Sequence, residues 1–397
     1  MCLQGYQLVR AENVTKAPVD YVNTRIGNIS LLLVPTYPTV HLPNSMLRMI
    51  PQHREFVTDR MPGLPLNIPS HRRGSAFRLL PYCGDHVGLN PDLEYRYDQE
   101  IIKPYEYSVF LDDQDIEVRF APAAKAAIYS LKFERKGGRY VMLRTVEDGE
   151  LQLEGNAWYG YEKIKGTKNY LWMEFDQKPI EIKTCHREGM KACYARFADD
   201  VDEVKVRYGI SFLDAEQAHR NLEKEVPDYN IDKLAQAGRD RWNETLGKIS
   251  IEGGTEDQKT VFYTALYRSH ERMVNISEDG RYYNSFDGKI HDDEGVPFWT
   301  DDWIWDTYLA LHPLQVILAP KEEEQKLASY IRMCEATPQK WMPTFPTIFG
   351  DSHSMNGNHA AVMFADALCK GLNFDVRSAF EGMKSTDHLY MQKDLIL

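Results

Sequence analysis

The sequence lacks the features that mark several classes of protein. It has no excess of basic residues, since 47 Lys and Arg stand against 59 Asp and Glu and the net charge is −12. This acidic balance argues against a nucleic-acid backbone or an anionic membrane surface as the partner. No stretch approaches the roughly 20 apolar residues that a membrane-spanning helix needs. The first six residues also lack the basic start and the apolar run of a complete signal peptide.

Cysteine is sparse as well, and its spacing excludes the common zinc sites. The six cysteines are scattered, without a C-x-x-C pair or a Cys/His cluster. Tyrosine and tryptophan, in contrast, are plentiful, with 23 and 7 residues. This aromatic share is typical of proteins that handle carbohydrates. The length of 397 residues allows two domains, each with a sizeable core.

Residues 20–212 are predicted to form a β-sandwich domain, preceded by a tail at 1–19. Short apolar runs follow one another between turn residues, without helical periodicity. Three prolines (Pro35, Pro38 and Pro43) predict an irregular loop from Val34 to Met46. The clearest strand candidates are residues 30–34, 107–111, 126–133, 140–143, 171–175 and 204–212.

The spacing of apolar residues becomes helical near Asp214. We expect a helical linker at 213–248, then the first part of a helical domain at 249–397, opening with a short strand at 249–251. Helices in antiparallel pairs suggest part of an (α/α)6-type helical toroid, a ring that needs more helices than the sequence predicts. The chain is therefore expected to stop inside this domain. The predicted helices span residues 215–225, 231–246, 255–273, 303–318, 321–334, 359–372 and 376–383.

Tryptophan and aspartate gather in one stretch, residues 297–320. An aromatic ring can stack on the C–H face of a sugar while a neighbouring carboxylate accepts its hydroxyl hydrogens. The alternative is a buried aromatic helix start in which Asp301 or Asp302 is the N-cap. The residues concerned are Trp299, Trp303, Trp305, Asp301, Asp302 and Asp306.

Five blocks of sequence, in order along the chain, carry a family resemblance. They are YVNTRIG at 21–27, TYPTVHLPNSM at 36–46, FYTALY at 262–267 with DGRY at 279–282, WDTY at 305–308 with HPL at 312–314, and GNHAA at 357–361 with ADA at 365–367. Together they resemble glycoside hydrolase family 92, the calcium-dependent, inverting α-mannosidases. The blocks cover nearly the whole chain, and the fourth is the most specific.

The resemblance implies an exo-acting α-mannosidase that hydrolyses terminal α-mannosides of glycans with inversion. It implies Ca²⁺ as cofactor, a mannose-containing glycan as partner, and a periplasmic or extracellular location. Trp305 would offer a ring face to the sugar, Asp306 would accept its hydroxyls, and His359 would lie at the rim. The family's general acid, base carboxylates and calcium ligands lie later in its helical domain. No catalytic or metal-binding residue is therefore expected within 1–397, which would be an incomplete, inactive fragment.

Other interpretations stay open at this point. Asp306 could be a helix-capping carboxylate, and His359 could be a histidine satisfied at a helix start. The whole could be a carbohydrate-binding or scaffold protein without hydrolytic activity. A third hypothesis is another helical-toroid glycosidase or a sugar phosphorylase that uses Asp301 or Asp306 as its acid.

Overall fold

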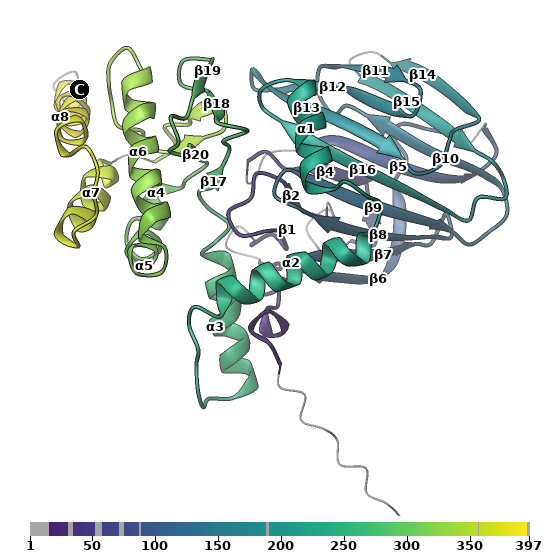
Figure 1. Ribbon diagram of the computed structural model, residues 1–397, viewed down its shortest axis with the longest axis horizontal. Helices are drawn as coiled ribbons and strands as arrows, with labels where there is room; N and C mark the ends of the chain where they lie inside the picture. The colour runs from purple at the N-terminus through teal and green to yellow at the C-terminus, as the bar shows by residue number, and fades with distance from the viewer. Residues whose placement is uncertain are drawn as a thin grey trace, which may run out of the picture.

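The computed structural model shows a body of β-sheet followed by a helical body (Figure 1). It describes residues 16–30, 35–51, 58–70, 75–86, 89–187, 190–355 and 357–394. Most of the predicted strand 30–34 and the first fifteen residues of the tail lie outside these ranges. The predicted fold class, a β-sandwich followed by a helical domain, is confirmed.

Two antiparallel sheets form the sandwich (Figure 1). Within the described residues the larger sheet has the order β11-β12-β13-β16-β9-β8-β7-β6-β3, and the smaller has the order β14-β15-β10-β5-β4. The strands are β3 Arg60–Met61, β4 Leu64–Asn67, β5 Ala76–Gly84, β6 Tyr95–Lys103, β7 Glu106–Leu111, β8 Ile116–Pro122, β9 Ala126–Phe133, β10 Gly138–Arg144, β11 Gly149–Glu154, β12 Ala157–Ile164, β13 Thr167–Phe175, β14 Glu181–Arg187, β15 Met190–Phe197 and β16 Glu203–Ser211.

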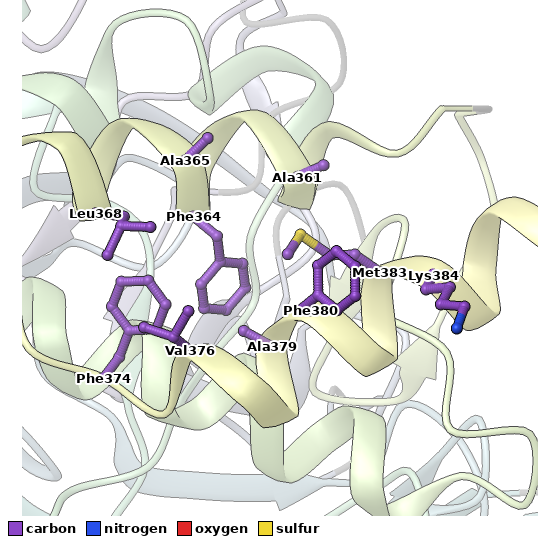
Figure 2. Close-up of a pocket in the computed structure, with 10 residues that line it drawn as sticks. All are labelled: Ala361, Phe364, Ala365, Leu368, Phe374, Val376, Ala379, Phe380, Met383 and Lys384. Atoms are coloured by element: carbon purple, nitrogen blue, oxygen red, sulfur yellow. The ribbon is translucent and has the colours of Figure 1, made fainter.

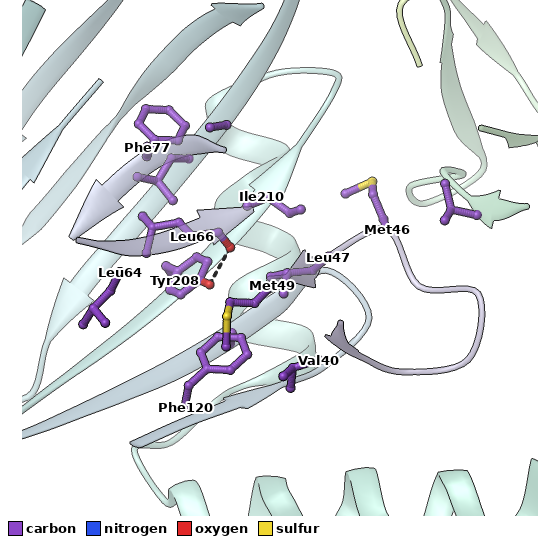
Figure 3. Close-up of a cluster of buried hydrophobic side chains, with 14 of the residues drawn as sticks. Val40, Met46, Leu47, Met49, Leu64, Leu66, Phe77, Phe120, Tyr208 and Ile210 are labelled. Atoms are coloured by element: carbon purple, nitrogen blue, oxygen red, sulfur yellow. Dashed lines mark hydrogen bonds between the residues drawn. The ribbon is translucent and has the colours of Figure 1, made fainter. Parts of the chain in front are cut away.

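The core of the sandwich is filled by side chains that the facing sheets turn inward. Alternate residues of β13 are buried, as a strand with one face on a core requires. Figure 3 shows part of this core, where aromatic and aliphatic side chains of both sheets meet. The Tyr208 hydroxyl of β16 donates to the Leu66 carbonyl of β4 over 2.7 Å, so a buried hydrogen bond joins the two sheets.

Two helices follow the sandwich, α1 (Ala215–Glu225) and α2 (Ile231–Leu246). Asp214 caps α1, because its carboxylate accepts from the Gln217 N–H over 2.6 Å. The helix α1 lies directly on β16. A Cβ added at Gly209 would stand 2.1 Å from the Ala218 carbonyl oxygen, so only glycine allows this approach. The segment predicted as a linker is thus packed against the sandwich.

The helical body contains α3 to α8 and several short strand pairs (Figure 1). No helix among the described residues is both long enough and apolar enough to cross a membrane. The helices are α3 Glu256–Arg268, α4 Ile304–Thr307, α5 Leu311–Leu318, α6 Pro320–Ala336, α7 His359–Cys369 and α8 Val376–Asp394. The short strands pair β17 Val274–Asn275 with β20 Trp299–Thr300, β18 Arg281–Asn284 with β19 Lys289–Asp292, and β21 Pro346–Thr347 with β22 Gly350–Asp351.

Two predicted elements are wrong. The helix expected over 303–318 is broken into α4 and α5, because Pro313 lacks an N–H and its ring would clash with the carbonyl four residues earlier. Pro313 therefore lies in the first turn of a new helix. Residues 249–251 form no strand, since Ile249 and Ile251 pack against a hydrophobic cluster instead of pairing.

The proline-rich loop joins the two bodies. It carries β1 (Val40–His41), paired with β2 (Arg48–Met49), and is otherwise irregular. The Trp242 indole N–H of α2 donates to the His41 carbonyl over 2.7 Å. The Asn44 side chain donates to the Met273 carbonyl over 2.8 Å. This loop therefore fixes the start of the helical body against the sandwich.

Candidate functional site

The tryptophan–aspartate stretch divides into a buried part and an exposed part. Asp301 and Asp302 are both 0% exposed. Three residues later Trp305 is 47% exposed, and Asp306 is also exposed. The buried carboxylates need partners, because an unpaired buried charge is strongly unfavourable. Those partners come from two different parts of the fold.

Asp301 is bound by the sandwich. The Arg48 Nη1 atom of β2 lies 2.7 Å from Asp301 Oδ2, and the Ser70 hydroxyl donates to Oδ1 over 2.6 Å. Arg272 of the helical body lies farther away, with Nη1 at 3.9 Å from Oδ2. Asp301 has a φ of +64°, a left-handed conformation that aspartate tolerates better than most residues.

Asp302 is bound by the helical body. Its Oδ1 accepts from the Thr307 hydroxyl over 2.8 Å, and its Oδ2 accepts from the Tyr330 hydroxyl over 2.7 Å. His312 Nε2, at the start of α5, lies 2.9 Å from the same Oδ2. Asp302 therefore joins the segment before α4 to the last residue of that helix, and it connects both to α5 and α6.

His312 continues this network into α6. Its Nδ1 atom lies 2.6 Å from Glu323 Oε1, and the Lys326 ammonium donates to Glu323 Oε2 over 3.3 Å. The side chains of His312, Glu323 and Lys326 are all at most 2% exposed. Two carboxylates and two cations thus balance their charges inside the helical body.

The electrostatics favour the charged forms of His312, Asp302 and Glu323. Burial alone would lower the pKa of His312, but Glu323 and Asp302 outweigh it and raise this pKa to about 10. Burial would raise the pKa of Asp302, but His312, Tyr330 and Thr307 bring it below its usual value. Burial would also raise the pKa of Glu323, but His312 and Lys326 outweigh it and bring this pKa below its usual value.

Two of the expected roles for these aspartates are wrong. Neither Asp301 nor Asp302 caps a helix, since the N-cap of α4 is Trp303 and it makes no side-chain cap bond. Both carboxylates are instead engaged by buried partners. Asp301 cannot serve as a general acid either, because it is fully buried and paired with Arg48.

The three residues predicted to bind sugar lie on neighbouring segments. Trp305 and Asp306 are consecutive in α4, and Tyr308 follows directly after it. The Tyr308 ring stacks on the ring of His359, the first residue of α7, with centroids 4.6 Å apart and an angle of 22°. His359 Nε2 is buried and has no hydrogen-bond partner among the described residues, which disfavours the fully satisfied histidine of the alternative interpretation.

Sequence reasoning missed two partners of the stretch. Arg272 lies over the Trp303 ring, with its guanidinium carbon 3.8 Å from the ring centroid. His312 stands in the HPL block, but its bond to Asp302 spans ten residues across a helix break. No periodicity connects residues at that distance. A clue was available, since a histidine in an apolar helix needs polar partners.

One group of side chains in the described ranges has the composition of a metal site. Ligand atoms of Glu174, His219 and Glu223 lie within 4.8 Å of one another. The Arg207 guanidinium, however, lies 2.7 Å from both Glu174 and Glu223 and already supplies the positive charge. One imidazole and two carboxylates do not match the six to eight oxygen ligands of Ca²⁺. The cluster therefore does not fit the implied calcium ion.

A cavity of about 400 Å³ lies between α7 and α8 (Figure 2). Its lining side chains offer almost no polar atoms that could bond the hydroxyls of a sugar, so the cavity does not match a sugar site. Its lining is apolar except for one lysine: Ala361, Phe364, Ala365, Leu368, Phe374, Val376, Ala379, Phe380, Met383 and Lys384.

Comparison with known proteins defines the family. The glycosyl hydrolase family 92 N-terminal domain matches residues 21–211, and the glycosyl hydrolase family 92 catalytic domain matches residues 217–394. The chain belongs to glycoside hydrolase family 92, as the five sequence blocks predicted.

Solved structures agree with this assignment. A family GH92 inverting mannosidase from Bacteroides thetaiotaomicron VPI-5482 is similar with a TM-score of 0.84 and 26% identity, over 93% of this chain and 55% of that one. A family GH92 α-mannosidase from Bacteroides thetaiotaomicron, solved in complex with mannoimidazole, has a TM-score of 0.82 and 20% identity, over 94% and 55%. The chain thus spans about half the length of these proteins.

A curated fungal protein matches a shorter region. It is described as an uncharacterized secreted glycosidase of Arthroderma benhamiae, and it is 44% identical over 71 residues. The match covers 17% of this chain and 9% of that protein.

Proposed function

We propose that the protein is an exo-acting α-mannosidase that hydrolyses terminal α-mannosides of glycans with inversion. Trp305, Asp306 and His359 would line its mannose subsite. The observation that carries this proposal is the exposed Trp305–Asp306 pair on a turn that two buried aspartates anchor. The similar inverting mannosidase supports the reaction, and the mannoimidazole complex of the second relative supports mannose as the sugar.

The chemistry of the subsite follows from its side chains. The Trp305 ring would stack on the C–H face of the mannose. The Asp306 carboxylate would accept hydrogen bonds from the mannose hydroxyls, and these bonds would fix the orientation of the sugar ring. His359, held against Tyr308, would border the subsite. These contacts orient the sugar, and none of them transfers a proton to the leaving group.

Inverting hydrolysis also needs a protonated carboxyl on the leaving oxygen and a carboxylate that activates water, roughly 6.5–9.5 Å apart. We assign neither group, and no calcium ligand, to the described residues. When bound, Ca²⁺ would supply a positive charge beside the sugar hydroxyls. We expect residues 1–397 alone to bind α-mannosides without hydrolysing them. The secreted fungal relative supports an extracellular or periplasmic location.

The test has a binding arm and a turnover arm. Isothermal titration with methyl α-mannoside should give a weak saturable affinity that Trp305→Ala abolishes and that EDTA leaves unchanged. A p-nitrophenyl α-mannoside should not be cleaved by residues 1–397 alone, with or without Ca²⁺. Calcium-dependent release of mannose by this chain would show that the catalytic groups lie within it. Absence of binding would contradict the mannose subsite.

A further inference from the structure

We propose that His312 is the positioning residue of the mannose subsite: through Asp302 it fixes the orientation of α4, and so of Trp305 and Asp306. The role in sugar binding rests on the proposed function. The role in fixing the turn rests on geometry alone. The buried His312 side chain acts without touching the sugar.

The helix α4 depends on outside support. It has only four residues, and a single helical turn does not form stably without tertiary contacts. Its N-cap residue makes no side-chain cap bond. The Asp302 carboxylate, which precedes α4, instead accepts from the Thr307 hydroxyl at the far end of the turn. The exposed pair Trp305–Asp306 lies between these two points.

Asp302 is in turn held by an imidazolium. A carboxylate can only accept hydrogen bonds, so a histidine placed between two of them must donate from both ring nitrogens. His312 does this, with Nε2 at 2.9 Å from Asp302 and Nδ1 at 2.6 Å from Glu323. The raised pKa keeps both protons in place at neutral pH. The ring therefore has one orientation and fixes the position of Asp302 relative to α6.

The surroundings leave the network little freedom to rearrange. Tyr330 donates to the same Asp302 oxygen over 2.7 Å, and Lys326 binds the outer oxygen of Glu323. Each of these groups is at most 1% exposed, so water cannot replace a lost partner without a change in packing. A glutamine at position 312 would leave two buried carboxylates without the cation between them. The turn that Asp302 holds should then shift.

The experiment reads the position of Trp305 directly. Residues 1–397 are labelled with 5-fluorotryptophan, and the ¹⁹F resonance of Trp305 among the seven tryptophans is assigned from Trp305→Phe. In His312→Gln we expect this resonance to shift or broaden while that of the distant Trp242 stays in place. Affinity for methyl α-mannoside should fall about tenfold or more, as expected for a small displacement of a binding group.

A milder variant keeps the test decisive if His312→Gln does not fold. Thr307→Val conserves shape and removes the hydroxyl that donates to Asp302 and, over 3.2 Å, to the Trp303 carbonyl, while His312 stays in place. It should move the Trp305 resonance in the same direction by a smaller amount. Val141→Ala, a core change in β10 of the sandwich, is the control that should leave that resonance unchanged. If Trp305 stays unmoved in the folded variants, the positioning role is refuted. If the unmutated chain binds no mannoside, the proposed function fails, while the fluorine spectra still decide the positioning role.

Discussion

Asp301 and Asp302 are adjacent in the chain, and their side chains bind different bodies of the protein. Asp301 pairs with Arg48 of the sandwich at 2.7 Å, and Asp302 binds His312 of the helical body at 2.9 Å. The positive φ of Asp301 turns the backbone between them. The segment that leads to Trp305 is therefore held from two sides.

Loss of the charge at Asp301 should destabilise the fold strongly. Asp301→Asn keeps the size of the side chain but leaves the buried Arg48 without its anion, which typically costs about 3–5 kcal/mol. Urea unfolding followed by circular dichroism measures this loss. Asp113→Asn, which breaks a pair with the half-exposed Arg96, is the control and should cost less than about 1 kcal/mol. Equal losses in both variants would contradict the anchoring role of Asp301.

The pH dependence of stability should report His312. Its pKa is about 10 in the folded protein and near 6.5 when unfolded, so its stabilisation is complete below pH 6.5 and is lost as pH rises towards 10. One proton changes the free energy of unfolding by about 1.4 kcal/mol per pH unit in this window. Urea titrations from pH 6.5 to 10 should show a shallower decline in His312→Gln. Parallel curves for both proteins would show that His312 is not an imidazolium.

A buried glutamate between the two bodies predicts a second pH effect. Glu278 accepts from the Phe212 N–H over 3.0 Å and from the Asn221 side chain over 2.7 Å, and burial raises its pKa to about 7. The protonated form is favoured in the fold, so stability should fall as pH rises from about 4.5 to 7. Glu278→Gln should flatten this decline. Part of it should remain, because burial also raises the pKa of Glu162 to about 7. An unchanged slope would contradict the assignment.

Trp305 should matter for binding and little for stability. It is 47% exposed, so Trp305→Ala should change the free energy of unfolding by less than about 1 kcal/mol. The fully buried Trp242, which donates to the His41 carbonyl, is the matched comparison. Trp242→Ala should cost about 3–5 kcal/mol. Thermal melts of both variants test this, and a large loss in Trp305→Ala would indicate a structural residue.

Local signals in the sequence predicted the regular elements well where they were strong. The bounds of α1 and α2 agree with the prediction, because Asp214 and Asn230 mark their starts as caps. The strand β9 agrees because it is a long, mainly apolar run. The strand β5 was missed, since Pro81 in its middle argues against an inner strand, and β6 was missed because its exposed residues are polar.

The site could be predicted only in its exposed part. The pair Trp305–Asp306 is adjacent in sequence and carries a recognisable chemistry. Two sets of contacts lie behind it. One joins Asp302, His312 and Glu323 across a helix break. The other pairs Asp301 with Arg48, which lies more than half of the chain away in the sequence. Such contacts depend on how the elements pack, which neither periodicity nor composition records.

A crystal of residues 1–397 soaked in methyl α-mannoside tests the proposed mannose subsite most directly. We expect density for one sugar with its C–H face on the Trp305 ring and a hydroxyl within hydrogen-bond distance of the Asp306 carboxylate, and no such density in crystals of Trp305→Ala. A sugar bound elsewhere in both crystals, with the Trp305–Asp306 turn empty, would contradict a mannose subsite at this turn.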